Sequence, residues 1–253
     1  MSAVPPVLRV TGLTHRYGHA QVLDDVTFDL HPGEVVAVIG PSGAGKTTLF
    51  RCITQLTRPD GGQVELCETR LTDLRGSQLR EARRPVGMIF QAYNLVRRLS
   101  ALNNVLCGRL ATTPTWPVLL GRASTLDQAR AAACLDRVGL AHLARSRADR
   151  LSGGQQQRVA IARVLAQETR VVLADEPVAS LDPTSSAVVL ATLRDLARQD
   201  GIAVLCSLHQ IDLVAGFADR VIGLRHGRVV LDVAAEQFST SQRDGVYRDS
   251  TAP

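Results

Sequence analysis

The segment from Gly40 to Thr47, with the sequence GPSGAGKT, constrains the fold of this chain more than any other feature. A glycine, four variable residues and then Gly-Lys-Thr form the pattern of a phosphate-binding loop. In such a loop, glycines permit a tight turn and backbone N–H groups surround phosphate oxygens. The apolar stretch Val35–Ile39 precedes the loop, and Thr48–Ile53 has the pattern of a helix. The sequence therefore predicts a buried strand, a tight loop and a helix whose N-terminus faces an anion.

Lys46 is the only lysine among the 29 basic residues of the chain. Arginine serves at every other basic position, whereas a lysine ammonium is a compact charge on a slim stem that reaches phosphate oxygens from within a tight loop. A simple Gly/Ser turn explains neither this lysine nor the strand and helix patterns beside it. The residues that we expect to hold phosphate are Gly40, Pro41, Ser42, Gly43, Ala44, Gly45, Lys46, Thr47 and Thr48.

The composition suits a globular protein without a nucleic-acid partner. With 253 residues and 45% hydrophobic content, the chain can form one large α/β domain or a core with a subdomain. Its net charge of +5 is compatible with nucleic-acid binding. However, the arginines are scattered, and aromatic residues make up only 4% of the chain, too few for a base-stacking surface.

We expect neither a membrane span nor a disulfide framework. No apolar run approaches the roughly 20 residues needed to cross a bilayer, and the first residues lack the charged and apolar regions of a signal peptide. The five cysteines are odd in number and widely spaced. They show no metal-ligand spacing, which indicates reduced thiols.

Strand and helix patterns alternate along most of the chain, which predicts a doubly wound α/β core with a mainly parallel sheet. The expected strands are Leu8–Val10, Val22–Leu30, Val35–Ile39, Val86–Phe90, Val171–Ala174, Ile202–Cys206, Val221–Leu224 and Val229–Val233, and the expected later helices are Leu126–Val138, Gln155–Ala166 and Ser185–Gln199. Residues from about 91 to 152 lack strand patterns and predict a helical subdomain, inserted between core segments 1–90 and 153–235. We expect a single domain over residues 1–250, with a polar, frayed tail over 237–253.

Two carboxylates, Asp175 and Glu176, follow the apolar stretch that begins at Val171. Asp175 suits the hydration shell of a Mg²⁺ ion whose direct protein ligand is the Thr47 hydroxyl. Glu176, one residue further, is suited to orient and polarise an attacking water. An acidic turn after a strand is common on its own, but the phosphate-binding loop upstream favours a catalytic role.

The segment Leu151–Gln155, with the sequence LSGGQ, opens a predicted helix. Ser152 is suited to cap this helix, and Gly153 and Gly154 leave backbone N–H groups bare, so that a second anion-binding helix N-terminus is predicted. An ordinary capped helix is the alternative. A dimer that holds nucleotide between the phosphate-binding loop of one copy and Ser152, Gly153, Gly154 and Gln155 of the other gives this second site a use.

The order of GPSGAGKT, LSGGQ and ADEP resembles that of the ATP-binding-cassette (ABC) ATPases, and the similarity extends from about Leu8 to Val233. The resemblance implies a P-loop NTPase core of ABC type, with an N-terminal antiparallel β subdomain, the inserted helical subdomain, and ATP and Mg²⁺ as cofactors. It also implies roles for Tyr17 (stacking on adenine), Gln91 (contacts to the γ-phosphate and metal), Asp182 (the dimer-interface loop) and His209 (contact to the γ-phosphate). On their own, Tyr17 and His209 are also compatible with structural roles.

Several stretches resemble the phosphonate importer ATPases more specifically, notably Asn94–Ser100, Asn104–Leu110, Thr115–Trp116 and Leu119–Gly121. Asn103 departs from the glutamate that such proteins often carry. The resemblance implies a homodimer, bound to integral membrane permease subunits at the cytoplasmic face of the cell membrane and served indirectly by an extracytoplasmic solute-binding protein. Phosphonates or related phosphorus oxyanions are the implied cargo. The alternatives are an ABC ATPase for another small solute, an exporter component, or a soluble ABC protein outside transport.

An apolar cluster, Leu95, Val96 and Leu99, lies beside Arg97 and Arg98 in the expected connector. One interpretation is a groove for a short permease helix, with apolar residues lining it and arginines at its rim. The other is local packing of the helical insert.

Overall fold

The computed structural model describes residues 4–111 and 124–247. The segments Thr115–Trp116 and Leu119–Gly121 therefore lie outside the described residues. In chain order the strands and helices are β1 (Leu8–Tyr17), β2 (Ala20–Leu30), β3 (Val35–Ile39), α1 (Lys46–Ile53), β4 (Gly61–Leu66), β5 (Thr69–Arg70), α2 (Gly76–Ala82), β6 (Val86–Ile89), α3 (Ala101–Leu106), α5 (Thr125–Arg137), α6 (Gly153–Ala166), β7 (Val171–Asp175), α7 (Pro183–Asp200), β8 (Ala203–Ser207), β9 (Arg220–Arg225), β10 (Arg228–Ala234) and α8 (Thr240–Tyr247).

The strands of the described residues form two sheets. The larger has six described strands in the order β10-β9-β3-β8-β7-β6, and the smaller has four in the order β2-β1-β4-β5. In the larger sheet, β3 runs parallel to β8 and β9, and β7 runs parallel to β6 and β8. Among the described strands of this sheet, β10 alone is antiparallel to its neighbour. The described pairings of the smaller sheet are all antiparallel, as expected for the N-terminal β subdomain.

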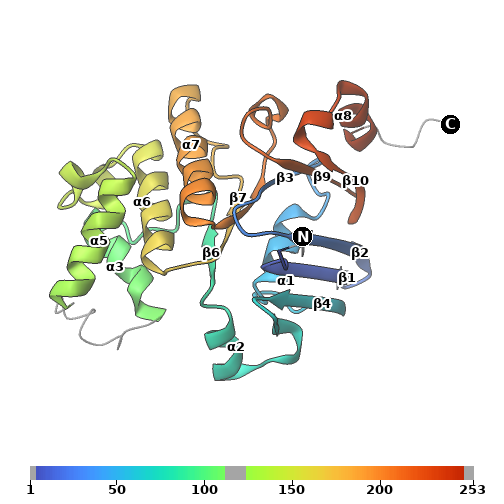
Figure 1. The fold of residues 1–253 in the computed structure, drawn as a ribbon, viewed down its shortest axis with the longest axis horizontal. Helices are drawn as coiled ribbons and strands as arrows, with labels where there is room; N and C mark the ends of the chain where they lie inside the picture. The colour runs from blue at the N-terminus through green and yellow to red at the C-terminus, as the bar shows by residue number, and fades with distance from the viewer. Residues whose placement is uncertain (1–3, 112–123, 248–253) are drawn as a thin grey trace.

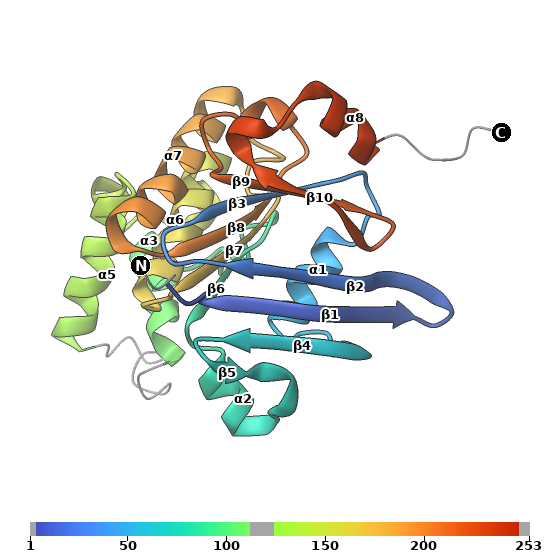
Figure 2. The same cartoon turned by 45° about the vertical axis from the view of Figure 1, so that its right-hand side comes forward.

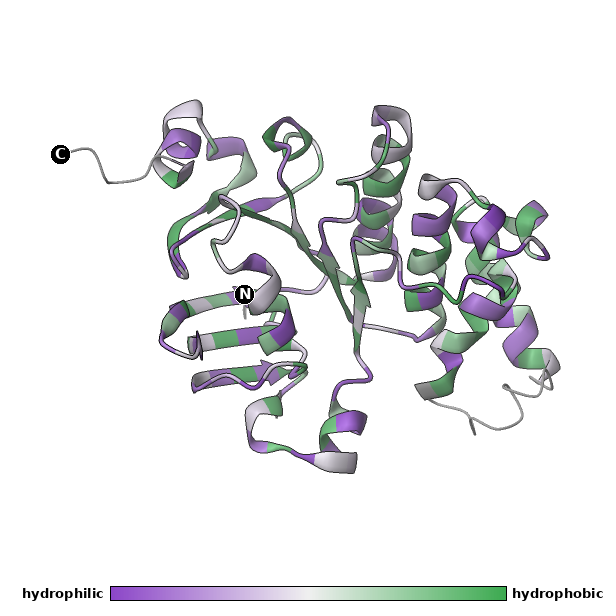
Figure 3. Ribbon diagram, turned by 180° about the vertical axis from the view of Figure 1, so that it is seen from behind, coloured by the Kyte–Doolittle hydropathy of each residue, from purple (hydrophilic) through white to green (hydrophobic). Residues whose placement is uncertain are grey.

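Alternate residues of β3 face two separate cores because successive strand side chains point to opposite faces of a sheet. Val35, Ala37 and Ile39 join a cluster with buried residues of α3, α5, α6 and α7. Val36 and Val38 join a second cluster with α1 and the antiparallel sheet. Figure 2 shows these layers on either side of the larger sheet, and Figure 3 shows its central strands as predominantly hydrophobic. Burial on both faces explains why these strands read as unbroken apolar runs.

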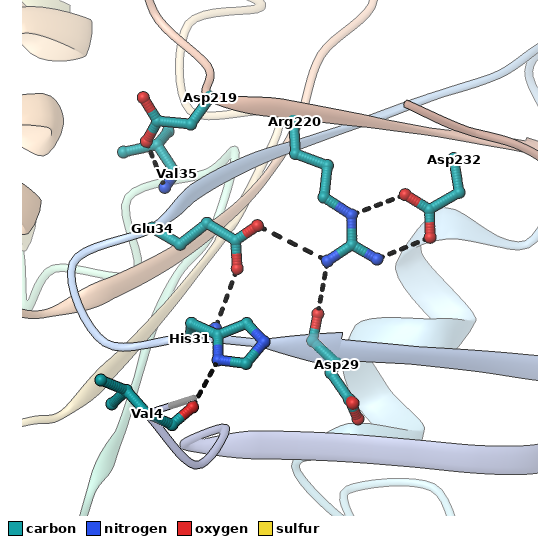
Figure 4. Close-up of polar contacts among 8 residues, drawn as sticks. All are labelled: Val4, Asp29, His31, Glu34, Val35, Asp219, Arg220 and Asp232. Atoms are coloured by element: carbon teal, nitrogen blue, oxygen red, sulfur yellow. Dashed lines mark hydrogen bonds and ion pairs between the residues drawn. The ribbon is translucent and has the colours of Figure 1, made fainter. Parts of the chain in front are cut away.

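Arg220 joins the two sheets at the start of β9 (Figure 4). Its Nε and Nη2 atoms each donate a hydrogen bond of 2.6 Å to the carboxylate of Asp232 on β10. Its Nη1 donates one of 3.0 Å to the backbone carbonyl of Asp29 on β2 and lies 3.5 Å from Oε1 of Glu34. A planar guanidinium fork suits this geometry, and the bonds to Asp232 raise the pKa of Arg220.

The strands near the N-terminus differ most from the sequence prediction. β1 is longer than Leu8–Val10, because register shifts after Val10 disturb its period-two pattern. β4 was missed, since its two leading glycines obscure the alternation of Val64 and Leu66.

The prediction of a frayed tail from Gln237 is wrong for its described part, where α8 forms. Although the sequence of α8 is polar, Val246 is buried in the first core cluster. The helical region also differs in extent from the predicted 91–152, because α6, which begins at Gly153, packs against α3 and α5. Within the described residues, no helix is both long and apolar enough to cross a bilayer.

Candidate active site

The loop between β3 and α1 is tight because its glycines adopt positive φ angles, and two of them lie so close to neighbouring backbone that no side chain would fit. Gly40, Gly43 and Gly45 have φ values of 153°, 82° and 102°, a region that favours glycine. A Cβ atom on Gly40 would lie 2.1 Å from the carbonyl oxygen of Leu224, and one on Gly45 would lie 2.7 Å from that of Val22. The backbone therefore folds closely against β9 and β2, and α1 begins directly after the loop at Lys46.

Lys46 points back into its own loop. The side chain is 5% exposed, and Nζ donates hydrogen bonds of 2.8 Å to the carbonyl of Gly40 and 3.1 Å to that of Pro41. Burial lowers the pKa of Lys46, while the nearby charges of Glu176 and Asp175 act in the opposite direction. A poorly hydrated ammonium is thus held at the base of the loop, ready to exchange a carbonyl oxygen for a phosphate oxygen.

A pocket of about 390 Å³ opens in front of this loop. It brings together segments that lie far apart in the sequence, and it is lined by Tyr17, Val22, Ser42, Gly43, Gly45, Lys46, Thr47, Thr48, Glu176 and His209. Tyr17 is 47% exposed, and its ring meets that of His15 edge to face with centroids 4.6 Å apart. The exposed part of Tyr17 offers an aromatic surface beside the cationic loop.

Two acidic residues, Asp175 and Glu176, stand at the carboxyl end of β7, and Glu176 lines the pocket. Ser207, the last residue of β8, donates a hydrogen bond of 2.9 Å to Oδ1 of buried Asp175. The Ser207 hydroxyl also accepts a hydrogen bond of 2.9 Å from the N–H of Glu176. This second bond holds Glu176 at a φ of 50°, an uncommon value for a residue with a side chain. Sequence reasoning gave Ser207 no role, although its place at the end of an apolar strand was a usable signal.

Glu176 and His209 form a pair at the pocket. Nε2 of His209 lies 2.5 Å from Oε1 of Glu176, and both residues line the pocket. A carboxylate held by a histidine is arranged to position a water molecule and to handle its proton.

The LSGGQ segment forms a reciprocal cap at the start of α6. Gln155 N–H donates 3.3 Å to the Ser152 hydroxyl, and Ser152 N–H donates 2.9 Å to Oε1 of Gln155. A Cβ on Gly153 would lie 2.9 Å from the Tyr93 hydroxyl, and one on Gly154 would lie 2.7 Å from Oγ of Ser185. The glycines thus let other elements approach the start of α6 closely.

Asp182 caps α7 beside the same region. Its Oδ1 accepts a hydrogen bond of 2.9 Å from the N–H of Ser185, and hydrogen bonding to Ser185 lowers the pKa of Asp182. Ser185 therefore connects the starts of α6 and α7, a link that sequence reasoning missed.

Some of the predicted residues do not line the pocket of the single chain. Gly40, Pro41 and Ala44 belong to the loop itself, and Asp175 directly precedes Glu176. The others are the segment 152–155, Asp182, and Gln91, which is exposed in the turn after β6. The structure therefore places the predicted residues in two sets, one around the phosphate-binding loop and one at the starts of α6 and α7. Gln91 belongs to neither.

The donor atoms at the loop suit Mg²⁺. This hard cation takes oxygen ligands and binds through one or two protein groups, with waters and substrate phosphates completing its shell. Thr47 offers a hydroxyl and Asp175 a carboxylate, so the residue types fit. Among the described residues no cluster of three or more His, Cys, Asp or Glu side chains is present, and a magnesium ion shared with phosphates needs none.

The fold and the pocket define a P-loop nucleotide-binding ATPase. Residues 23–179 match the family model described as ABC transporter, and the chain therefore belongs to the ABC transporter family as an ATP-hydrolysing cassette. The LSGGQ segment and the antiparallel sheet beside the P-loop core agree with this assignment.

Curated relatives and solved structures are similar over most of the chain. The chain is 50% identical to the phosphonates import ATP-binding protein PhnC of Bradyrhizobium diazoefficiens, over 90% of this chain and 85% of the relative. It is 45% identical to the hypophosphite import ATP-binding protein HtxD of Stutzerimonas stutzeri, over 95% of this chain and 71% of the relative. The dimeric structure of the bacterial ABC transporter cassette MJ0796 is 33% identical, with a TM-score of 0.77 over 91% of this chain and 100% of that one.

Proposed function

We propose that this chain is the ATP-hydrolysing subunit of an importer for phosphonates or related phosphorus oxyanions. The observation that carries the ATPase part is the pocket that combines Lys46, Glu176 and His209. The cargo is supported by the similarity to import proteins for phosphonates and hypophosphite. The transported solute is handled by other subunits, and this chain supplies the energy.

The working unit in this proposal is a homodimer with two ATP molecules at its interface. The phosphate-binding loop of one copy holds an ATP whose outer side meets Ser152–Gln155 and Asp182 of the other. The separation of these two sets of residues on the single chain supports this arrangement. The dimeric MJ0796 cassette, similar over most of this chain, also supports it.

Hydrolysis follows from the charges at the pocket. Tyr17 stacks on the adenine, and the loop N–H groups and Lys46 hold the phosphates. Glu176, held by Ser207 and His209, orients the attacking water, while Lys46 and His209 stabilise the charge that develops on the transferred phosphoryl group. Thr47, Asp175 and Gln91 are the residues that would hold Mg²⁺, and the ion would neutralise phosphate charge.

A permease helix docks, in this proposal, on the segment between β6 and α3. Val96 there is 52% exposed, and Arg97 and Arg98 are exposed beside it. The segment has a fixed shape, because Asn104 accepts a hydrogen bond of 2.7 Å from Val96 N–H and donates one of 3.1 Å to its carbonyl. Leu95 instead packs, partly buried, against the first core cluster. We therefore assign Leu95 to the packing of the insert and Val96 to the surface that meets the permease.

Reconstitution tests the proposal. The chain is co-purified with the permease encoded beside its gene, placed in proteoliposomes and supplied with the cognate binding protein. Methylphosphonate, hypophosphite, phosphate and sulfate are then compared as stimulators of ATP hydrolysis and as transported solutes. We expect phosphonate or hypophosphite to stimulate most. Stimulation by sulfate alone would overturn the cargo assignment while leaving the ATPase assignment in place.

A further inference from the structure

The last helix, α8, ends against the first glycine of the phosphate-binding loop. Gly40 N–H donates a hydrogen bond of 3.2 Å to the hydroxyl of Tyr247, the last residue of α8. The carbonyl of the same glycine accepts the hydrogen bond of 2.8 Å from Nζ of Lys46. Gly40 thus connects the Tyr247 side chain to the lysine at the base of the pocket.

Gly40 has no side chain that could fix its backbone conformation. Its φ of 153° and its close approach to the Leu224 carbonyl exclude any side chain. A glycine backbone has more conformational freedom than that of any other residue, so Gly40 depends on contacts with other parts of the chain. The hydrogen bond to Tyr247 supplies a constraint from outside the loop.

The Tyr247 hydroxyl is itself held in place by the packing of α8 on β9. Val246 is 1% exposed, and it packs so closely that a Cβ on Gly223 would lie 2.5 Å from its Cγ2. Nη1 of Arg225 donates a hydrogen bond of 2.6 Å to the carbonyl of Gly245. Figures 1 and 2 show α8 beside β9 and β10, on the opposite side of the molecule from α5.

The helix α8 and the strand that leads into the loop, β3, both contact β9. β9 pairs in parallel with β3, Ile39 opposite Gly223, and Ile39 immediately precedes Gly40. The strand on which α8 packs is therefore next to the strand that leads into the loop. Tyrosine is a neutral phenol near pH 7, and the oxygen of the Tyr247 hydroxyl accepts the Gly40 hydrogen.

We propose that Tyr247 is a positioning residue for ATP binding. Its hydroxyl holds Gly40, and through Gly40 it holds the loop and Lys46 in the form that receives the phosphates. Tyr247 does not line the pocket and acts only through the loop. Its contribution therefore belongs to nucleotide binding, whereas Glu176 and His209, which follow β7 and β8, carry out the chemistry without it.

Tyr247→Phe tests this proposal, since the substitution removes the hydroxyl and keeps the ring. We expect the Kd and KM for ATP to rise about two- to tenfold, the range that one hydrogen bond supplies, with kcat at saturating MgATP unchanged. Thermal unfolding is measured beside the kinetics. Leu135→Val is the control, because it removes volume from the buried core beside α5, on the opposite side of the molecule from α8, and leaves Tyr247 intact.

Three results would overturn the proposal. The first is ATP binding by Tyr247→Phe as tight as that of the parent. The second is a fall in kcat with KM unchanged. The third is the same rise in KM in Leu135→Val, which would show that loss of stability alone produces it.

Amide hydrogen exchange tests the hydrogen bond between Gly40 and Tyr247 directly. We expect the Gly40 amide to be protected in the parent protein. We expect Tyr247→Phe to increase the exchange rate of this amide at least severalfold. Rapid exchange of Gly40 in the parent would mean that the hydrogen bond does not form, and the proposal would fail. ATP hydrolysis and transport by the parent are independent of this outcome.

Discussion

The hydroxyl of Ser207 donates a hydrogen bond of 2.9 Å to Oδ1 of Asp175, and so joins the last residue of β8 to the last residue of β7. The two residues are register partners in the parallel sheet. Because the same hydroxyl also accepts the N–H of Glu176, one serine orients both acidic residues at the end of β7.

Ser207→Ala should therefore impair hydrolysis more than binding. The substitution leaves Asp175 Oδ1 without this donor and the Glu176 N–H without this acceptor, at a cost of about 1–3 kcal/mol. We expect kcat to fall at least tenfold while the Kd for ATP changes less than threefold. Ser77→Ala, at an exposed position of α2, is the control. Normal kcat in Ser207→Ala would show that the hydroxyl does not position Glu176.

Glu176→Gln should produce a stable ATP-bound dimer. Glutamine keeps the size of the side chain but lacks the negative charge that, in the proposed mechanism, orients and polarises the attacking water. We therefore expect ATP to bind without being turned over. Lys46→Ala should instead weaken ATP binding first, and no such dimer should form. Size-exclusion chromatography with light scattering in the presence of ATP distinguishes the two variants. Glu176→Gln that retains ATP yet stays monomeric would contradict the shared-site arrangement.

Amine-selective acylation should report directly on Lys46, because the chain contains no other lysine. We expect modification at Lys46 and the amino terminus only, loss of ATP binding in step with Lys46 modification, and protection by MgATP. Burial lowers the pKa of Lys46, so its neutral, reactive form appears at lower pH than that of an exposed lysine, which titrates near about 10.4. Mass spectrometry identifies the modified sites. Full ATPase activity with Lys46 acylated would exclude its role.

The parts of the fold that follow from local sequence were predictable, and those that depend on distant partners were not. β3 was predicted with its observed bounds, because burial on both faces makes it a continuous apolar run. The helix α8 has a polar sequence, and the burial of its residue Val246 is explained by packing on Gly223 of β9. No pattern within residues 237–253 contains that information.

The same distinction applies to the site. Lys46, Asp175 and Glu176 stand in contiguous motifs, so their chemistry is readable from the chain. The hydrogen bonds of Ser207 to β7 and of Tyr247 to Gly40 join residues 32 and 207 positions apart. Such contacts exist only once the order of the strands is known.

Asp127→Asn should lower stability in a pH-dependent way. Asp127 is buried in α5, where its carboxylate accepts hydrogen bonds of 2.7 Å from the Ser124 hydroxyl and 3.1 Å from Nε of Arg109. The Ser124 bond is the larger cause of the lowered pKa of Asp127, and Arg109 adds to it. A carboxyl whose folded pKa lies below its unfolded value stabilises the fold above the unfolded value. This stabilisation is lost as the pH falls through the folded one.

We therefore expect Asp127→Asn to reduce the free energy of unfolding by about 2 kcal/mol at pH 7. The difference from the parent should shrink as the pH falls below about 4. Urea unfolding at a series of pH values measures it, with exposed Asp195→Asn of α7 as the control. A difference that stays constant down to pH 3 would mean that the ionised carboxylate is not the stabilising species.

Val96→Asp should separate docking from folding. Val96 is exposed while its neighbour Leu95 packs against the core, so a charge at Val96 should change the free energy of unfolding by no more than about 0.5 kcal/mol and leave ATP binding intact. A buried carboxylate at the permease interface would lack a partner and oppose assembly. We therefore expect less co-purification with the permease and loss of transport.

Val230→Asp, at a β10 position that is 42% exposed, is the matched control for Val96→Asp. Normal assembly and transport in Val96→Asp would exclude this segment as the docking surface, because a charged side chain at its most exposed apolar position would then be tolerated.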